Sequence, residues 1–314
     1  MSSYLRKIAS SIPSVISLIS IFSFILPANA TATATTHCNI LALSGGGAFG
    51  AVEVGIVDAL VSTKRIPPLF DVITGISAGG LNAGVFSYYN DIVTALPTLI
   101  NMYSTITTQD VYYSDMRNLF SRWSIYNNAP LEKTMATLLQ SLPLPKYPPI
   151  VLIGATNVYT EELDIFMLNS LPLSEKIDVL MSTTAIPVIF PPRMYNHSLY
   201  IDGGIISNEI IYQATGFIDC AFYNITFIAA RALHGINNIT GFTSYLSAVL
   251  HTVFTTFDSQ LAQVTTCRYP KGQINACFPT DPQLETYSVL DFNHGKSLYL
   301  SGRNNHTCIT YDLC

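Results

Sequence analysis

The sequence predicts an α/β fold with a mostly parallel central sheet and helices on both faces. Short apolar strand segments alternate with helical segments, and glycine-rich turns follow the first two strands. The 314 residues suffice for one large domain with a buried core and are few for two independent domains. Apolar residues make up 49% of the chain and charged residues only 11%, so membrane-spanning runs must be considered first.

The N-terminal segment has the layout of a secretory signal peptide. Arg6 and Lys7 precede an apolar, serine-containing run over residues 12–26, and Ala28-Asn29-Ala30 supplies the small residues at which such peptides are cleaved. The run is shorter than the about 20 residues that a spanning helix needs. We therefore expect cleavage after Ala30 rather than an uncleaved anchor. Later apolar segments are interrupted by Pro, Gly, Asn or charge, so we expect no permanent transmembrane segment after cleavage.

Strands and helices alternate along the rest of the chain. Apolar runs predict strands at residues 39–43, 70–74, 150–155, 163–168, 199–201 and 226–230. Apolar residues at helical spacing predict helices at residues 52–61, 77–88, 91–104, 130–142, 174–184 and 243–264. The residues after 264 are expected to be rich in loops.

Glycines dominate the turn after the first strand, at Gly45, Gly46, Gly47 and Gly50, with Ala48 and Phe49 between them. Successive glycines let several backbone amides converge, as an oxyanion hole requires. The spacing also fits a dinucleotide-binding fingerprint, but that fold needs an acid at the end of the second strand, and Asp71 lies at its start. A Walker loop is excluded because no Gly-Lys-Ser/Thr follows.

The turn after the second strand, Gly75-Ile76-Ser77-Ala78-Gly79, fits a nucleophile elbow. In such an elbow a strained serine lies between strand and helix, and flanking glycines relieve the crowding. The same residues also suit a tight packing turn, so this motif alone leaves both interpretations open.

Asp202-Gly203-Gly204 follows the strand at 199–201 and, taken alone, is an ordinary turn. The three motifs, however, occur in the order glycine-rich loop, Gly-x-Ser-x-Gly and Asp-Gly-Gly. With this combination the chain resembles the patatin-like phospholipase family. The proline-rich segment 184–192 and Asn208 add to this resemblance, which extends over residues 39–216.

The resemblance implies a patatin-like three-layer fold and a lipid acyl hydrolase of the phospholipase A type that needs no metal or cofactor. Ser77 is implied as the nucleophile and Asp202 as the proton acceptor. The implied oxyanion hole comprises Gly45, Gly46, Gly47 and Ala48, and the further motif glycines are Gly50, Gly75, Gly79, Gly203 and Gly204.

Together with the signal-peptide layout, the resemblance divides the chain into four expected segments. Residues 1–30 form the signal peptide, 31–38 a short lead-in, 39–264 the patatin-like catalytic domain, and 265–314 a cysteine-bearing extension of the same domain. Phe49 departs from the family, which often has Arg or Lys at this position, so we expect no cation near the loop.

Two alternatives remain open. An α/β-hydrolase esterase would need a histidine after the acid, and His251 and His294 have the right order. A secreted lipid-binding or storage glycoprotein could keep the fold without activity. A Ser-Asp dyad is expected to work at lower pH than a histidine-based triad, because aspartate stays ionised where histidine is protonated.

The other chemical features indicate an oxidising lumen. Sequons lie at Asn196, Asn224, Asn238 and Asn305. Six cysteines, whose pairing the sequence leaves open, lie at Cys38, Cys220, Cys267, Cys277, Cys308 and Cys314. We therefore expect the secretory pathway, with a secreted or a vacuolar or lysosomal destination. The formal net charge of −5 opposes nucleic-acid binding, and the expected partner is a lipid or membrane-surface substrate. The oligomeric state and the lipid class stay open.

Overall fold

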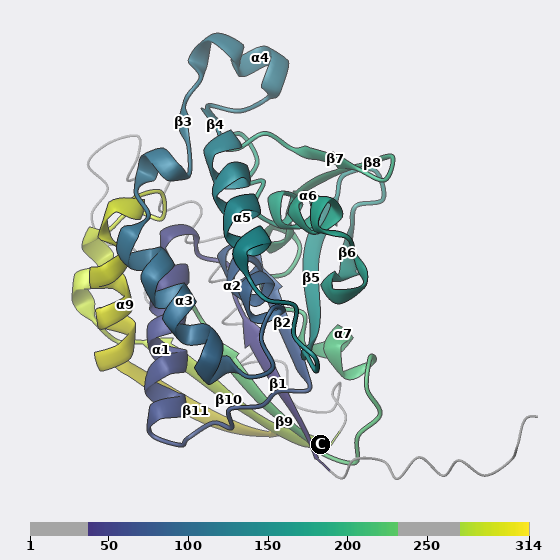
Figure 1. Ribbon diagram of the computed structural model, residues 1–314, viewed down its shortest axis with the longest axis vertical. Coiled ribbons are helices and arrows are strands. Elements are labelled where there is room, and N and C mark those ends of the chain that lie inside the picture. The colour runs from purple at the N-terminus through teal and green to yellow at the C-terminus, as the bar shows by residue number, and fades with distance from the viewer. Residues whose placement is uncertain (1–36, 232–270, 314) are drawn as a thin grey trace, which may run out of the picture. The chain divides into compact units, whose positions relative to one another are not determined.

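The computed structural model describes residues 37–231 and 271–313 (Figure 1). The expected signal peptide, the expected helix at 243–264, Asn238 and His251 lie outside the described residues. Among the described helices, none has the length and apolar character needed to cross a bilayer.

The described part of the chain contains a nine-stranded mixed sheet. Its strands are β1 (Cys38–Leu43), β2 (Val72–Ile76), β5 (Ile150–Asn157), β6 (Glu162–Met167), β7 (Arg193–Tyr195), β8 (Ser198–Asp202), β9 (Tyr223–Ile228), β10 (Gly272–Pro279) and β11 (His306–Leu313). The order is β11-β10-β9-β1-β2-β5-β8-β7, with β6 also paired to β5. The five central strands from β10 to β5 run parallel, whereas β6, β7, β8 and β11 pair antiparallel. The predicted α/β class with a mostly parallel sheet is confirmed.

Helices cover the sheet (Figure 1), and the sheet separates the buried apolar residues into two cores. They are α1 (Gly50–Ser62), α2 (Ser77–Phe86), α3 (Ile92–Thr105), α4 (Leu119–Arg122), α5 (Ala129–Ser141), α6 (Leu173–Thr183), α7 (Ile211–Thr215) and α9 (Gly295–Asn304). Leu41 and Leu43 of β1 contribute to the larger core, and Ile40 and Ala42 to the core that includes α7. This alternation follows from the two-residue period of a strand, which turns successive side chains to opposite faces.

The segment after residue 270 differs from the loop-rich tail that we expect from its sequence. It forms β10, α9 and β11, and β10 pairs in parallel with β9 while β11 closes that edge antiparallel to β10. An edge strand has a partner on one side only and keeps much of its surface in solvent. The side chains of β11 are accordingly mostly exposed or half-buried, so its apolar signal is weak.

Two disulfides lie within the described residues. Cys38, at the start of β1, bonds Cys220, which precedes β9. Cys277 of β10 bonds Cys308 of β11, and these two residues face each other in the strand register. Both bonds therefore connect elements that are already neighbours in the sheet, an arrangement suited to an oxidising compartment.

Candidate active site

Ser77 lies at the junction of β2 and α2, and its backbone has a φ of 51°. A side chain on Gly75 would overlap the carbonyl oxygen of Gly79, and one on Gly79 would lie 2.5 Å from the carbonyl oxygen of Ser44. The elbow can therefore form only with glycine at both positions. The Ser77 amide donates to Thr183 Oγ1 at 2.9 Å, and the Thr183 hydroxyl donates to the Gly154 carbonyl at 2.6 Å.

The strand register brings Asp202 next to this elbow. Ile76 of β2 pairs with Gly154 of β5, and the following residue of β5, Ala155, pairs with Asp202 of the antiparallel strand β8. The end of β8 thus meets the end of β2 across a single intervening strand. Gly203 and Gly204 then begin a 3₁₀ turn that ends at Ile205.

Asp202 is fully buried, and its Oδ1 accepts the Gly204 amide at 2.8 Å. Burial raises the pKa of Asp202 from 3.8 to about 7, while the Ser77 hydroxyl and the Gly204 amide each lower it in part. Asp202 Oδ2 is buried and forms no hydrogen bond with any of the described residues. The Ser77 hydroxyl therefore lies near enough to act on the carboxylate without forming a well-aligned hydrogen bond. A pKa of about 7 is close to the ordinary value for histidine, so it does not support the prediction that a Ser-Asp dyad works at lower pH than a triad.

The glycine-rich loop lies directly against Ser77. A side chain on Gly45 would be 3.0 Å from Ser77 Cβ. The Gly45 amide donates to Asn208 Oδ1 at 2.8 Å, and the Ala48 amide donates to the Val289 carbonyl at 2.8 Å. Across the described ranges, no hydrogen bond from the amides of Gly46 or Gly47 to another protein group is found. Of the four predicted oxyanion positions, these two therefore have amides with no hydrogen-bond partner found among the described residues.

Gly47 has a φ of +59°, and a side chain there would overlap the carbonyl oxygen of Val289. Val289 follows β10 and lies far from the loop in the sequence. The segment expected to be a loop-rich tail therefore fixes the conformation of the candidate oxyanion loop.

A buried polar network supports the far end of this loop. Asn82 Nδ2 donates to the Gly50 carbonyl and to Glu53 Oε2, both at 3.0 Å, and Tyr103 donates to Asn82 Oδ1 at 2.9 Å. Burial and the charge of Glu53 hold the pKa of Tyr103 well above its usual range. These contacts connect α1, α2 and α3 at the point where the loop enters α1.

A cation does lie beside the loop, contrary to the expectation drawn from Phe49. The guanidinium of Arg231, which follows β9, lies over the Phe49 ring at 4.8 Å from its centroid. A side chain on Gly46 would be 3.7 Å from Arg231 Cγ. Burial lowers the pKa of Arg231 to about 10, so the group stays charged at neutral pH. Its Nη1 is buried, and among the described residues it has no hydrogen-bond partner.

An apolar cavity opens beside Ser77 and Gly47. Its volume is about 40 Å³. Its apolar lining consists of Ala78, Leu81, Met102, Ile106, Val111, Leu131, Met135, Ile186, Phe190 and Phe292. Thr184 and Tyr103 also contribute to the wall. Ser77 therefore faces a cavity whose lining is made largely of hydrocarbon.

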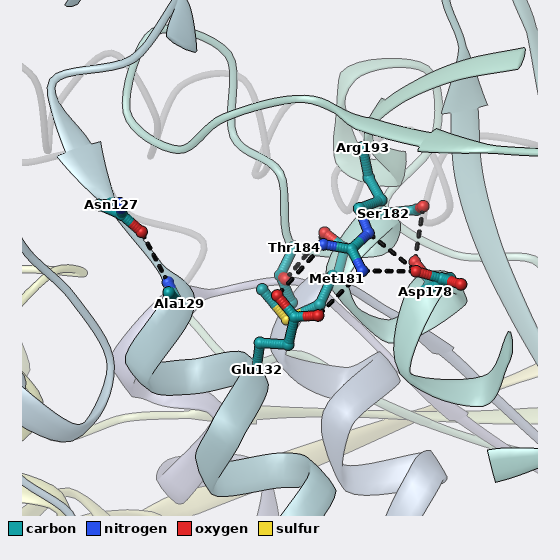
Figure 2. Close-up of polar contacts among 8 residues, drawn as sticks. All are labelled: Asn127, Ala129, Glu132, Asp178, Met181, Ser182, Thr184 and Arg193. Atoms are coloured by element: carbon teal, nitrogen blue, oxygen red, sulfur yellow. Dashed lines mark hydrogen bonds and ion pairs between the residues drawn. The ribbon is translucent and has the colours of Figure 1, made fainter. Parts of the chain in front are cut away.

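Arg193 of β7 links α5, which contributes Leu131 and Met135 to the cavity lining, to α6 (Figure 2). It donates to both oxygens of Glu132 on α5, at 2.9 and 3.1 Å, and from Nε to Asp178 on α6 at 2.9 Å. Burial lowers the pKa of Arg193, but these hydrogen bonds and charges outweigh that effect and raise it overall. Thr184 directly follows α6, and its hydroxyl donates to the Leu180 carbonyl of that helix at 3.0 Å. Asn127 Oδ1 accepts the Ala129 amide at the start of α5 at 2.9 Å.

Two residues of the alternative interpretations, His294 and Asp71, lie away from this site. His294 is exposed, and its Nδ1 lies 2.9 Å from Asp291 Oδ2. It does not line the Ser77 cavity. Asp71 precedes β2 at the opposite end of the strand from Ser77, and it accepts the Asn39 amide at 2.8 Å. An acid at that edge cannot hold the ribose of a dinucleotide bound at the glycine-rich loop.

Thr183 and Arg231 were not predicted as site residues. Thr183 directly precedes the proline-rich segment that contributed to the resemblance. This position in the sequence is the one signal that could have indicated Thr183 as a site residue. Arg231 follows a predicted strand, but nothing in its local sequence relates it to Phe49.

Comparison with known proteins identifies the family. The sequence profile of the patatin-like phospholipases matches residues 41–215, more than half of the chain. The chain is 29% identical over 181 residues to the probable lipid hydrolase 463L of Invertebrate iridescent virus 6. This match covers 54% of this chain and 60% of that protein. It is 27% identical over 187 residues to the cGAMP-activated phospholipase of Pseudomonas aeruginosa, covering 54% and 53% respectively.

Triacylglycerol lipase 5 of Saccharomyces cerevisiae is 33% identical over 111 residues, which cover 32% of this chain and 14% of the lipase. The chain thus spans less than two thirds of the length of each of these relatives. The crystal structure of VipD from Legionella pneumophila aligns with a TM-score of 0.40 and 14% identity over 87% of this chain and 68% of that one. The profile match includes the glycine-rich loop, Ser77 and Asp202, and the chain belongs to the patatin-like phospholipase family.

Proposed function

We propose that the chain is a lipid acyl hydrolase that cleaves carboxylic esters, as a phospholipase of the A type does, with Ser77 as nucleophile and Asp202 as its base. The observation that carries the proposal is the position of a fully buried carboxylate, with a pKa near 7, beside a serine on a strained elbow. Membership of the family and relatives named as lipid hydrolase, phospholipase and lipase support the same reaction class.

In the first half of the reaction, Ser77 Oγ attacks the ester carbonyl carbon while Asp202 accepts the hydroxyl proton. The carbonyl oxygen becomes an oxyanion, which the amides of Gly46 and Gly47 stabilise. Collapse of the tetrahedral intermediate breaks the bond to the leaving alcohol, which takes the proton from Asp202. An acyl group remains on Ser77.

In the second half, water replaces the alcohol. Asp202 removes a proton from water, the resulting hydroxide attacks the acyl carbon, and Ser77 leaves as its oxygen regains the proton. The free fatty acid and the unmodified serine result. The buried Oδ2 of Asp202, which lacks a protein partner among the described residues, is the atom suited to carry the proton in both halves.

The apolar cavity suits the acyl chain. Its present volume holds only a few water-sized groups. A longer chain therefore requires the lining to move, and Met102 and Met135 have the flexible side chains needed for that adjustment. We propose that the acyl group enters between these residues while the head group stays outside.

The test is a panel of phospholipid, galactolipid and neutral acylglycerol esters assayed with the purified protein and with Ser77→Ala. We expect Ser77→Ala to lose activity by several orders of magnitude while remaining folded. A fluorophosphonate probe should label the wild type once and leave Ser77→Ala unlabelled. Labelling at another residue, with activity retained in Ser77→Ala, contradicts the assignment.

The two alternatives are separated by further variants. We expect Asp202→Asn to be inactive and His294→Gln and His251→Gln to be active. A folded but inactive histidine variant would support the triad. A wild type that is inactive on every ester but binds lipid would support the storage or lipid-binding interpretation.

We also propose that the chain enters the secretory pathway, with secretion or a vacuolar or lysosomal lumen as its destination. The disulfides and the exposed sequons at Asn196 and Asn305 support this proposal. Asn224 lies in β9 between two neighbouring strands, where a glycan is hindered. Glycosidase treatment should reduce the mass, with peptide mapping showing modification at Asn196 or Asn305. An intact Met1 on a membrane-bound product contradicts cleavage.

A further inference from the structure

A short finger, residues 113–127, extends beyond the body of the fold (Figure 1). Strands β3 (Tyr113–Ser114) and β4 (Tyr126–Asn127) pair antiparallel at its base, and α4 lies at its tip. Four large apolar side chains of the finger are exposed: Tyr113 at 49%, Met116 at 59%, Phe120 at 91% and Trp123 at 63%. Neighbouring apolar side chains with this much exposure mark an interaction surface rather than scattered exceptions.

The charges on the finger are arranged to favour an anionic surface. Arg117 and Arg122 are exposed, and the single acid of the finger is Asp115. Asp115 pairs with Arg122 at 3.3 Å, and its side chain is mostly buried, so the outward-facing charge is positive. This local sign contrasts with the net charge of −5 for the chain. Aromatic and methionine side chains flanked by arginine are the composition of an interfacial membrane anchor.

The base of the finger is continuous with the wall of the Ser77 cavity. The Ile125 amide donates to the Val188 carbonyl at 2.8 Å, and the Tyr126 amide donates to the Ile189 carbonyl at 3.0 Å. Phe190, the next residue, lines the cavity. A surface that binds the finger would therefore lie close to Phe190, and so to the wall of the Ser77 cavity.

Aromatic contacts reinforce this connection. The Tyr126 ring packs on Tyr112 with centroids 4.5 Å apart, and Tyr112 packs on Phe190 at 5.6 Å. The Tyr112 hydroxyl also donates to the Leu290 carbonyl at 2.8 Å. Tyr112, the residue before the finger, thus connects it to Phe190 of the cavity wall and to the segment at Leu290.

We infer that the finger inserts Met116, Phe120 and Trp123 into the surface of an anionic phospholipid bilayer and so presents the Ser77 cavity to lipid. The inference rests on the proposed function, which makes a lipid surface the partner of this region. A stable protein interface buries about 800 Å² on each partner. Fifteen residues with four exposed large apolar side chains make too small a contact for that, whereas an interfacial anchor needs only a few inserted side chains.

The experiment uses Trp123, the single tryptophan of the chain, as its reporter. Full-length protein carrying Ser77→Ala is mixed with phosphatidylcholine vesicles that contain phosphatidylglycerol, and tryptophan emission is recorded. We expect a shift to shorter wavelength and quenching by lipids with brominated acyl chains. Phe120→Ser should weaken vesicle binding about tenfold, because an apolar side chain no longer leaves water.

The matched control is Leu144→Ser, which removes a side chain that is 86% exposed outside the finger. We expect Leu144→Ser to bind vesicles as the parent does. Equal weakening by Leu144→Ser and Phe120→Ser overturns the inference, as does sedimentation with vesicles without a change in Trp123 emission. Equal affinity for vesicles of phosphatidylcholine alone contradicts the anionic surface. An emission shift that depends on protein concentration without lipid would assign the finger to a second copy of the chain.

Activity measurements separate this inference from the proposed function. In the wild-type background, Phe120→Ser should reduce hydrolysis of vesicle lipid while leaving turnover of a water-soluble short-chain ester unchanged. If the wild type cleaves the soluble ester but Trp123 does not respond to vesicles, only the finger inference fails. If Trp123 responds but no ester is cleaved, only the proposed function fails.

Discussion

The pKa of Asp202 makes activity and stability respond to pH in opposite directions. As the proposed base, Asp202 must be ionised, so kcat/KM on a soluble ester should rise with pH and level off above the pKa of about 7. Because the ionised fraction changes tenfold per pH unit below the pKa, activity at about pH 5 should be about 100-fold below the plateau. A pH profile of kcat/KM on the soluble ester measures this directly.

Stability should change in the opposite sense. The pKa of Asp202 in the folded chain lies above the ordinary value of 3.8, so the folded state binds this proton more tightly than the unfolded state. The contribution to the free energy of unfolding is fully present below about pH 4 and is lost as pH rises to about 7. At about 1.4 kcal/mol per unit, the loss between about pH 5 and about pH 8 has an upper bound of about 3 kcal/mol.

Asp202→Asn serves as the matched variant for both measurements. The amide cannot ionise, yet its oxygen can still accept the Gly204 amide. Urea unfolding at the two pH values should show a smaller pH dependence for Asp202→Asn than for the wild type, and the variant should be the more stable of the two at alkaline pH. A wild-type activity profile that is flat over this range, or equal pH dependence of unfolding in both proteins, refutes the reasoning.

Three further predictions follow from the candidate oxyanion loop and the sequence. Arg231→Met should lower kcat about tenfold in steady-state assays, and Arg231→Lys should retain most activity because it keeps a charge near Gly46; equal losses would indicate packing alone. Gly47→Ala should lower the free energy of unfolding by about 1–3 kcal/mol in urea titrations, because alanine disfavours its positive φ and meets Val289; unchanged stability contradicts this. Exhaustive EDTA treatment should leave ester hydrolysis unchanged, since the sequence has no EF-hand or zinc motif; loss reversed by calcium contradicts it.

The sequence predicts those parts of the molecule whose information is local. The strand, elbow and helix around Ser77 could be predicted because Gly75 and Gly79 relieve crowding within a few residues of the serine. The parallel centre of the sheet was predictable from the alternation of strands and helices. The short strand β7 and the polar edge strand β11 were missed because each has a weak apolar signal of its own.

Features that depend on distant pairing could not be predicted in the same way. The direction of β8 against β5 is not encoded in the residues of β8 alone, although it decides where Asp202 lies. The proximity of Arg231 to Phe49 depends on the pairing of β9 with β1, which brings the end of β9 beside the glycine-rich loop. Likewise, the contact of Val289 with Gly47 depends on the packing of a segment that follows β10.

The register of β2, β5 and β8 has a consequence for how the chain can tolerate insertions and deletions. The positions of Ser77 and Asp202 are set by backbone pairing through β5, so the connections between these strands can change length without separating the two side chains. Removing one residue from the middle of β5 would instead turn the following side chains to the opposite face and shift Asp202 relative to Ser77. Length variation should therefore be confined to the loops, while β5, which contributes no reacting group, must keep its number of residues.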